Sequence, residues 1–269
     1  MKRTDIVNAL IARGYEAEEK DSVKNGVIFE GIVIKSDDMI APIIYTQGLI
    51  EEAERRNMPL SEVVSQVIHL YEENKHIDIN VEELLDRNFV LSHVRIALQR
   101  ESDQDLVKKD SGYAGIEQYL YIRGDTGYTV KMNPGFLKNT GMSEEDIWEY
   151  AQSNTFTETR IRTMGEVLSD LSGGYYEEDE APTQMYVITN QSGLLGASAA
   201  LDKKSIADYF GGSGTNRLIV LPSSIHEMLL VPEKLSPGMD ELNEMVRSIN
   251  QSQVRPEERL TDRAYVIQI

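Results

Sequence analysis

The residues best suited to chemistry lie together in residues 221–229, LPSSIHEML. This segment holds Ser223, Ser224, His226 and Glu227, which supply hydroxyls, an imidazole and a carboxylate. A serine nucleophile needs a general base to take its proton, and the base needs a third group to orient it. One hypothesis is therefore a hydrolase or transferase that uses Ser223 or Ser224 with His226.

The spacing argues against a triad within this segment alone. In an extended chain Ser224 and His226 share a face, whereas Glu227 points the opposite way. A carboxylate from elsewhere would have to accept a hydrogen bond from His226 and orient it, and Asp262 and Glu257 are the candidates. The chain also lacks the GxSxG elbow that exposes a nucleophilic serine at a strand-to-helix turn.

The same residues fit a turn between two strands. Pro222 follows an apolar run, and the hydroxyls of Ser223 and Ser224 can bond nearby backbone groups. His226 is then a half-buried strand residue whose ring bonds a neighbour. We favour this interpretation, and we treat the turn as the first place to look for a site.

A second segment, residues 189–198 (TNQSGLLGAS), combines glycines with hydroxyls and amides. Such a loop can turn backbone N–H groups toward an anion. It lacks the Walker lysine and the GxGxxG pattern, so a hairpin turn at Gly193 and Gly196 is the favoured interpretation.

These two segments define the predicted ligand-binding site. If they connect neighbouring strands, their polar side chains line one pocket. The predicted ligand-binding residues are Asn190, Ser192, Gly193, Ser223, Ser224 and His226.

Metal and cofactor chemistry has little support in the sequence. The chain has no cysteine, which excludes disulfides, thiolate zinc sites and cysteine nucleophiles. His69, His76 and His93 are not at ligand spacing, and the acidic run 177–180 lacks a calcium-loop pattern. We expect no metal and no cofactor.

Composition restricts the partners. With 27 basic and 45 acidic residues the net charge is −18, so phosphate backbones repel the chain and we expect no nucleic acid. No apolar run reaches the roughly 20 residues that span a bilayer, and the N-terminal residues do not resemble a signal peptide. We expect a soluble, cytoplasmic protein that binds an unknown protein or small molecule. The oligomeric state cannot be read from the sequence.

Hydrophobic periodicity predicts an α+β fold, mainly antiparallel sheets with helices packed on one face. Asn25 and Gly26 predict a hairpin turn, while Ser61 and Ser143 are expected helix caps. The predicted helices are residues 4–13, 60–74, 81–86, 143–154, 162–171, 203–210 and 238–250. The predicted strands are residues 22–36 and 116–132, both as hairpins, and 40–45, 93–99, 185–190, 194–201, 217–222, 227–232 and 263–269.

Residues 172–183, SGGYYEEDEAPT, interrupt this pattern with paired glycines, acids and a proline. We predict two tightly associated α+β lobes, residues 1–172 and 184–269, joined by an acidic linker at 173–183. Tyr175 and Tyr176 could form a small protein-docking element there, although a plain linker is favoured.

Several motifs together resemble a known family. These are VKNGVIFEGIVI, IAPIIYTQG, YVITNQSGLLGASAAL, LIVLPSSIHEMLLVP and MVRSINQSQVRPEERLTDRAYVI. They are similar to a bacterial intracellular family catalogued as domain of unknown function 5688, although YAGIEQYLYI departs from its usual pattern. Residues 116–154 more distantly resemble YtpQ-like proteins of Firmicutes. The resemblance implies a bacterial intracellular origin and carries over no activity.

Two functional hypotheses follow. The first is a non-enzymatic module that binds a protein or a ligand near the two C-terminal turns, because the sequence offers no complete catalytic set. The alternative is the hydrolase or transferase built on Ser223 or Ser224, His226 and an acid such as Asp262.

Overall fold

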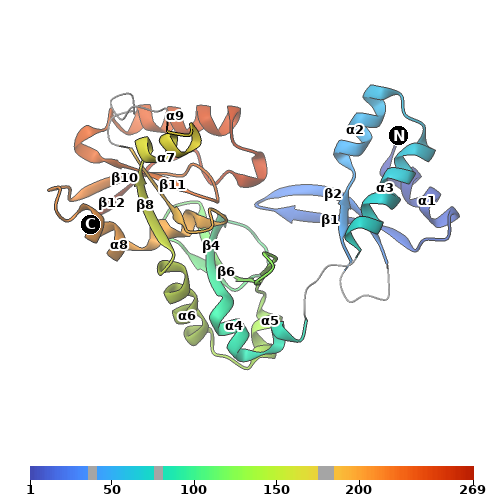
Figure 1. Ribbon diagram of the computed structural model, residues 1–269, viewed down its shortest axis with the longest axis horizontal. Coiled ribbons are helices and arrows are strands. Elements are labelled where there is room, and N and C mark those ends of the chain that lie inside the picture. Colours follow the sequence, from blue (N-terminus) through green and yellow to red (C-terminus); the bar gives the residue numbers. More distant parts are fainter. Residues whose placement is uncertain (36–40, 76–80, 175–184) are drawn as a thin grey trace. The chain divides into compact units, whose positions relative to one another are not determined.

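The computed structural model describes residues 1–35, 41–75, 81–174 and 185–269 (Figure 1). The chain divides into two compact units, Met1–Ile79 and Asn80–Ile269. Each unit combines antiparallel sheet with helices, which confirms the predicted α+β class. Among the described residues, no helix is both long and apolar enough to cross a membrane.

In its described residues, the N-terminal unit has a three-stranded antiparallel sheet in the order β1-β2-β3 and three helices. Its strands are β1 Ala17–Lys24, β2 Val27–Ile34 and β3 Ile43–Tyr45, and its helices are α1 Arg3–Ala12, α2 Gln47–Arg56 and α3 Leu60–Asn74. Asn25 and Gly26 join β1 to β2 with φ angles of 48° and 79°, so the predicted tight hairpin is confirmed. Ile6, Leu10, Ile32 and other apolar residues of these elements form one core.

Two local predictions in this unit are wrong. Helix α3 has the predicted bounds, but Pro59 occupies its N-cap and Ser61 lies inside the first turn. There the Ser61 carbonyl accepts a bond of 2.9 Å from Ser65 Oγ. The spacing of Ile6, Val7, Leu10 and Ile11 predicts that all four share the buried face of α1, but Ile11 is 53% exposed, because the core contacts of α1 end with Leu10.

The C-terminal unit contains two antiparallel sheets. One has the order β4-β6-β5, with β7 paired to β6; the other has the order β12-β10-β11-β9-β8. The strands are β4 Val94–Arg100, β5 Lys108–Asp110, β6 Ile116–Arg123, β7 Thr129–Lys131, β8 Thr159–Thr163, β9 Tyr186–Asn190, β10 Arg217–Leu221, β11 Met228–Pro232 and β12 Tyr265–Gln268.

The helices of this unit are mostly short. They are the α-helices α4 Arg87–His93, α5 Pro134–Thr140, α6 Glu144–Phe156, α7 Met164–Leu171, α8 Lys203–Phe210 and α9 Met239–Ser252, and the 3₁₀ helices η1 Glu83–Leu85, η3 Gly196–Leu201, η4 Glu233–Leu235 and η5 Pro256–Glu258. Ser143 caps α6 by accepting a bond from the Asp146 N–H, as predicted.

Three differences from the predicted elements have physical causes. Residues 194–201 form η3 in place of a strand, because Leu195 has a φ of 53° and the small residues that follow pack tightly as a 3₁₀ helix. Strand β8 occupies the start of the predicted helix 162–171, since the Thr163 side chain caps α7 only from that residue onward. Helix α4 was missed, and His93 therefore ends a helix where a strand start was expected.

The predicted linker does not divide the two units. Strand β8, before it, pairs with β9, after it, so both sides belong to one sheet of the C-terminal unit. The division lies between residues 79 and 80 instead of between 172 and 184. Most of the predicted linker, including Tyr175 and Tyr176, lies outside the described residues.

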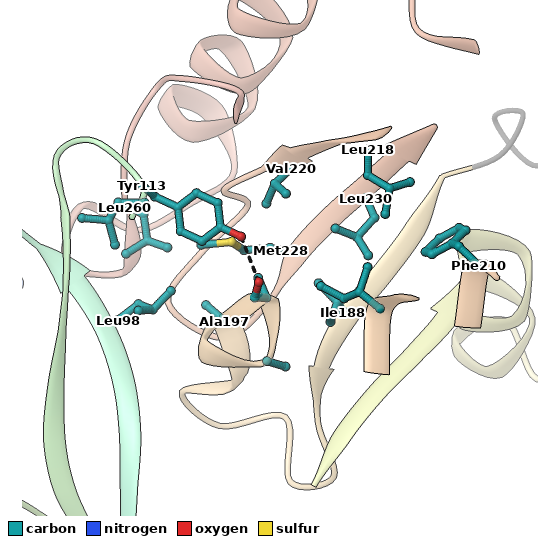
Figure 2. Close-up of a cluster of buried hydrophobic side chains, with 14 residues drawn as sticks. Leu98, Tyr113, Ile188, Ala197, Phe210, Leu218, Val220, Met228, Leu230 and Leu260 are labelled. Atoms are coloured by element: carbon teal, nitrogen blue, oxygen red, sulfur yellow. Dashed lines mark hydrogen bonds between the residues drawn. The ribbon is translucent and has the colours of Figure 1, made fainter. Parts of the chain in front are cut away.

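The five-stranded sheet is covered on both faces, which differs from the predicted single helical face. On one face Ile219, Leu221 and Val231 pack against Leu242 and Val246 of α9. The opposite face carries a larger core, which Figure 2 shows with Phe210 toward one end and Tyr113 toward the other. The Tyr113 hydroxyl donates 2.9 Å to the Ala200 carbonyl, and this bond ties the 111–115 loop to η3.

Candidate functional site

The LPSSIHEML segment is a turn between antiparallel strands. Leu221 ends β10 and Met228 begins β11, and Leu221 pairs with Leu229. Ser224 Oγ accepts a bond of 3.0 Å from the His226 N–H, and the Ser224 N–H donates 3.1 Å to the Glu227 carbonyl. The interpretation as a strand-to-strand turn is therefore confirmed for Ser224.

The His226 ring has a partner at each nitrogen. Its Nδ1 accepts from the Leu195 N–H at 3.1 Å, and its Nε2 lies 3.5 Å from Glu258 Oε1. The Leu195 N–H can only donate, so Nδ1 carries no proton in this arrangement. A general base must face the serine whose proton it takes. Here the two ring nitrogens face a backbone N–H and a carboxylate.

The acid beside His226 is Glu258, which is neither of the two predicted residues. Glu258 lies beside the ring, and Arg255 lowers the pKa of the Glu258 carboxyl, with a smaller contribution from His226. Asp262 instead accepts 2.7 Å from Asn250 Nδ2 of α9. Glu257 lies 3.9 Å from the Arg255 guanidinium.

The glycine-bearing loop after β9 is closed by its own polar groups. Asn190 Oδ1 accepts from both the N–H and the Oγ of Ser192, at 3.1 and 3.0 Å. Asn190 Nδ2 donates 2.8 Å to the Leu194 carbonyl. Gly193 has a φ of 67°, which supports the turn interpretation.

The two segments lie side by side, because β9 and β11 are neighbours in the sheet. Thr189 Oγ1 donates 2.8 Å to the His226 carbonyl, and a Cβ on Gly196 would come within 2.6 Å of that oxygen. The expected proximity is therefore present, but the side chains of Asn190, Ser192, Ser224 and His226 already bond one another or the backbone. That the six residues bind a ligand stays a prediction.

A first pocket, the aromatic pocket, lies at the opposite end of the same sheet, where β9 and β10 begin and β11 ends. Its volume is about 680 Å³. It is lined by Tyr186, Phe210, Ser213, Gly214, Thr215, Asn216, Arg217, Pro232, Glu233, Lys234 and Leu235. The glycine-rich loop 211–214 after α8 was the sequence signal that could have indicated this pocket.

The aromatic pocket combines an apolar wall with charged groups. Tyr186 and Phe210 meet edge to face, with ring centroids 4.9 Å apart. Arg217 lies 3.1 Å from Glu233, whereas Lys234 Nζ has a carbonyl partner, that of Gly214, at 3.5 Å. The lining thus carries two cations and one carboxylate.

A second pocket, the lysine groove, has a volume of about 450 Å³. It is lined by Ile96, Lys109, Ser111, Gly112, Tyr113, Gln118, Gln152, Phe156, Ala200, Leu201, Lys203, Val266, Ile267 and Gln268. This lining contains two lysines and three glutamines and no acidic side chain. No local pattern in the sequence indicates this groove, since its residues come from distant segments.

Strand β6 carries a row of polar side chains that the sequence reading overlooked. Glu117 accepts bonds from Gln99 Nε2 at 2.7 Å and Ser102 Oγ at 2.8 Å and pairs with Lys108 at 3.0 Å. Burial opposes ionisation of Glu117, but these bonds outweigh it and lower the pKa of the carboxyl. The alternation in EQYLYIR could have indicated this face.

Further along the same face, two arginines share one carboxylate. Arg95 Nη2 lies 3.0 Å and Arg123 Nη2 2.7 Å from Glu158 Oε1. Arg123 also donates 3.1 Å to Ser192 Oγ, which connects this cluster to the loop after β9. Burial raises the pKa of the nearby Tyr121 phenol to about 12, so it is a hydrogen-bond donor and not a base at neutral pH.

The histidines other than His226 have ordinary surroundings. His69 Nε2 lies 3.3 Å from Glu73 on an exposed face of α3, and His93 Nε2 lies 3.1 Å from Asp125. His76 lies outside the described residues. Within the described ranges, no three His, Asp or Glu side chains converge as metal ligands would.

The chain belongs to a family of unknown function, DUF5688, whose model matches residues 3–268. This match confirms the resemblance drawn from the sequence motifs. No curated protein and no solved structure matches the chain. The more distant similarity to YtpQ-like proteins has no support in these comparisons.

Proposed function

We propose that this protein is a binding module for a small molecule that joins an apolar ring to an anionic group, held in the aromatic pocket. The observation that carries the proposal is the pocket itself. Ligand sites have volumes of roughly 300–1,000 Å³ and apolar walls with a few placed polar groups. At about 680 Å³, the aromatic pocket is of this size.

The two parts of the ligand follow from the lining. Tyr186 and Phe210 offer ring surfaces against which a flat apolar group can pack. Lys234 and Arg217 together exceed the single carboxylate of Glu233, so the pocket has a net positive charge in a chain of net charge −18. Ser213 and Thr215 add hydroxyls at the rim. In an aromatic or alicyclic carboxylic acid, the ring can pack against the aromatic wall and the carboxylate can pair with the cations and accept bonds from the hydroxyls.

The alternative hydrolase or transferase is not proposed further. It requires a serine hydroxyl that faces a free ring nitrogen of His226. Ser224 Oγ instead accepts from the His226 backbone, and both ring nitrogens have other partners.

The proposal is tested with a fragment library measured by saturation-transfer NMR. The library contains aromatic carboxylates, neutral aromatic amides and aliphatic carboxylates of matched size. We expect the aromatic carboxylates to bind, and we expect Arg217→Gln with Lys234→Gln to weaken them about tenfold. Lys138→Gln, an exposed lysine outside the pocket, is the matched control and should have no effect. The proposal would be overturned if the doubly substituted protein bound aromatic carboxylates as tightly as the wild type. It would also be overturned if aromatic carboxylates bound no better than the other fragments.

A further inference from the structure

The lysine groove runs beside a strand edge whose backbone groups point outward. Strand β12 lies at the edge of the five-stranded sheet and pairs with β10. The Ile269 N–H donates 3.1 Å to the Asn216 carbonyl, so this residue faces β10. Backbone groups alternate in an antiparallel pair. The N–H and C=O groups of Val266 and Gln268 therefore face away from β10.

The outward-facing edge of β12 borders the lysine groove. Val266, Ile267 and Gln268 all line the lysine groove. In the part of the chain that the structure describes, no strand pairs with this edge and no group bonds the Val266 or Gln268 backbone. Sheet edges are commonly protected by charged residues or proline, and β12 (YVIQ) contains neither.

The charged residues of the lysine groove indicate what kind of ligand it would bind. None of the ion pairs among the described residues involves Lys109 or Lys203. The Lys109 ammonium lies 4.0 Å from the centroid of the Trp148 ring. Gln118 and Gln152 contribute amides, and no lining side chain is acidic. Lys109 and Lys203 therefore make the groove locally positive, so it favours negative charge even though the whole chain has a net charge of −18.

We propose that the lysine groove binds an extended peptide segment with acidic side chains, which adds a strand to the free edge of β12. In this mode main-chain hydrogen bonds supply affinity and alternate side chains supply specificity. The backbone of Val266 and Gln268 would bond the peptide, and Lys109 and Lys203 would pair with its carboxylates. This site is separate from the aromatic pocket and does not depend on the function proposed there.

The protein carries its own reporter for this test. Trp148 is its one tryptophan, and Lys109 lies over its ring. A carboxylate that draws on Lys109 should change the fluorescence of Trp148. Random decapeptides displayed on phage are selected on the full-length protein, with counter-selection on Lys109→Glu with Lys203→Glu. Selected peptides without tryptophan are then titrated while the emission of Trp148 is followed.

The variants separate backbone recognition from charge recognition. Val266→Pro removes an outward N–H at an edge position that tolerates proline, and Val266→Ala is its matched control because it keeps the N–H. Peptides methylated at every second backbone nitrogen provide the same test without changing the protein. Lys138→Glu is the control for the lysine substitutions.

We expect selected peptides to be rich in Asp and Glu at alternate positions. Lys109→Glu with Lys203→Glu should weaken them about tenfold or more, and Val266→Pro or backbone methylation should do the same. Val266→Ala and Lys138→Glu should change affinity less than about twofold. No enrichment over the double variant would overturn the proposal. So would binding that depends on the lysines but survives backbone methylation, because the groove would then recognise only a small anion.

Discussion

The two ends of the five-stranded sheet use their polar residues differently. At the end where β10 turns into β11, Ser224 and Asn190 bond backbone groups of their own segments, and His226 accepts bonds from Thr189 and Leu195 of the neighbouring segment. At the other end, Lys234 and Arg217 face a pocket of about 680 Å³ with only one carboxylate. Ser224 and His226, which the sequence suggested for catalysis, therefore stabilise the turn. The aromatic pocket is lined by residues that were not predicted to form a site.

This difference shows that residue type alone does not tell whether a polar side chain is available to a ligand. A hydroxyl or imidazole whose partners are all within the fold contributes to stability. A polar group is available to a ligand when the fold leaves part of its bonding capacity open. If the comparison is right, substitutions at the turn end should change stability, and substitutions at the pocket end should change binding.

Gly196→Ala should have the largest effect. A Cβ at this position would lie 2.6 Å from the His226 carbonyl and 2.7 Å from the Asn190 nitrogen, and these are backbone atoms that cannot easily move. We expect a loss of about 3 kcal/mol in the free energy of unfolding, measured by urea denaturation. Gly193→Ala, which meets no atom within 4 Å but has a φ of 67°, should cost about 1 kcal/mol. Equal losses would contradict the close packing of the two segments.

The two serines of the turn should differ. Ser224→Ala removes the acceptor of the His226 N–H and should cost about 1 kcal/mol. Ser223→Ala should change stability by less than about 0.5 kcal/mol, because the described structure gives the Ser223 hydroxyl no hydrogen bond. Both are measured by thermal and urea denaturation. A larger loss for Ser223→Ala than for Ser224→Ala would contradict this prediction, because the Ser223 hydroxyl would then be the one that stabilises the turn.

Glu227→Gln should have an effect that depends on pH. Burial raises the pKa of the Glu227 carboxyl, and the nearby His226 opposes this in part. In the unfolded chain a glutamate has a pKa of about 4.3. As the pH rises above that value, the unfolded state loses its proton first, so this group makes the protein less stable. We expect Glu227→Gln to gain stability over the wild type between pH 4 and pH 7. An unchanged difference would mean that Glu227 is not desolvated.

The pocket substitutions should have the smallest effect on stability. The side chain of Arg217 is 55% exposed, and an ion pair at such a surface contributes little. Arg217→Gln with Lys234→Gln should shift the free energy of unfolding by less than about 0.5 kcal/mol. A cooperative loss of structure, seen by circular dichroism, would place these cations in the scaffold instead of the pocket.

Local signals in the sequence were enough for much of the fold. The Asn25-Gly26 pair, the periodicity of α3 and the Ser143 cap act within a few residues, and each gave the observed element. The strand predicted for residues 194–201 was wrong, because small residues pack as readily in a 3₁₀ helix as in a strand. The linker prediction rested on local composition, which could not show that β8 and β9 pair across this segment.

The candidate sites depended on contacts over long sequence distances. Asp262 and Glu257 were the acids predicted to orient His226, and Glu258 lies beside its ring instead. A shift of one residue changes the direction of a side chain, which spacing alone could not fix. Phe210 and Lys234 line one pocket, and Lys109 and Val266 line another, only because the strand order of the sheets brings distant segments together.

The most direct test titrates the strongest aromatic carboxylate from the fragment library into three proteins by calorimetry. These are the wild type, Ser223→Ala with Ser224→Ala, and Arg217→Gln with Lys234→Gln. We predict unchanged affinity in the serine variant and a loss of about tenfold in the cation variant. Loss of binding in the serine variant, with full affinity in the cation variant, would contradict the account and return the site to the LPSSIHEML turn.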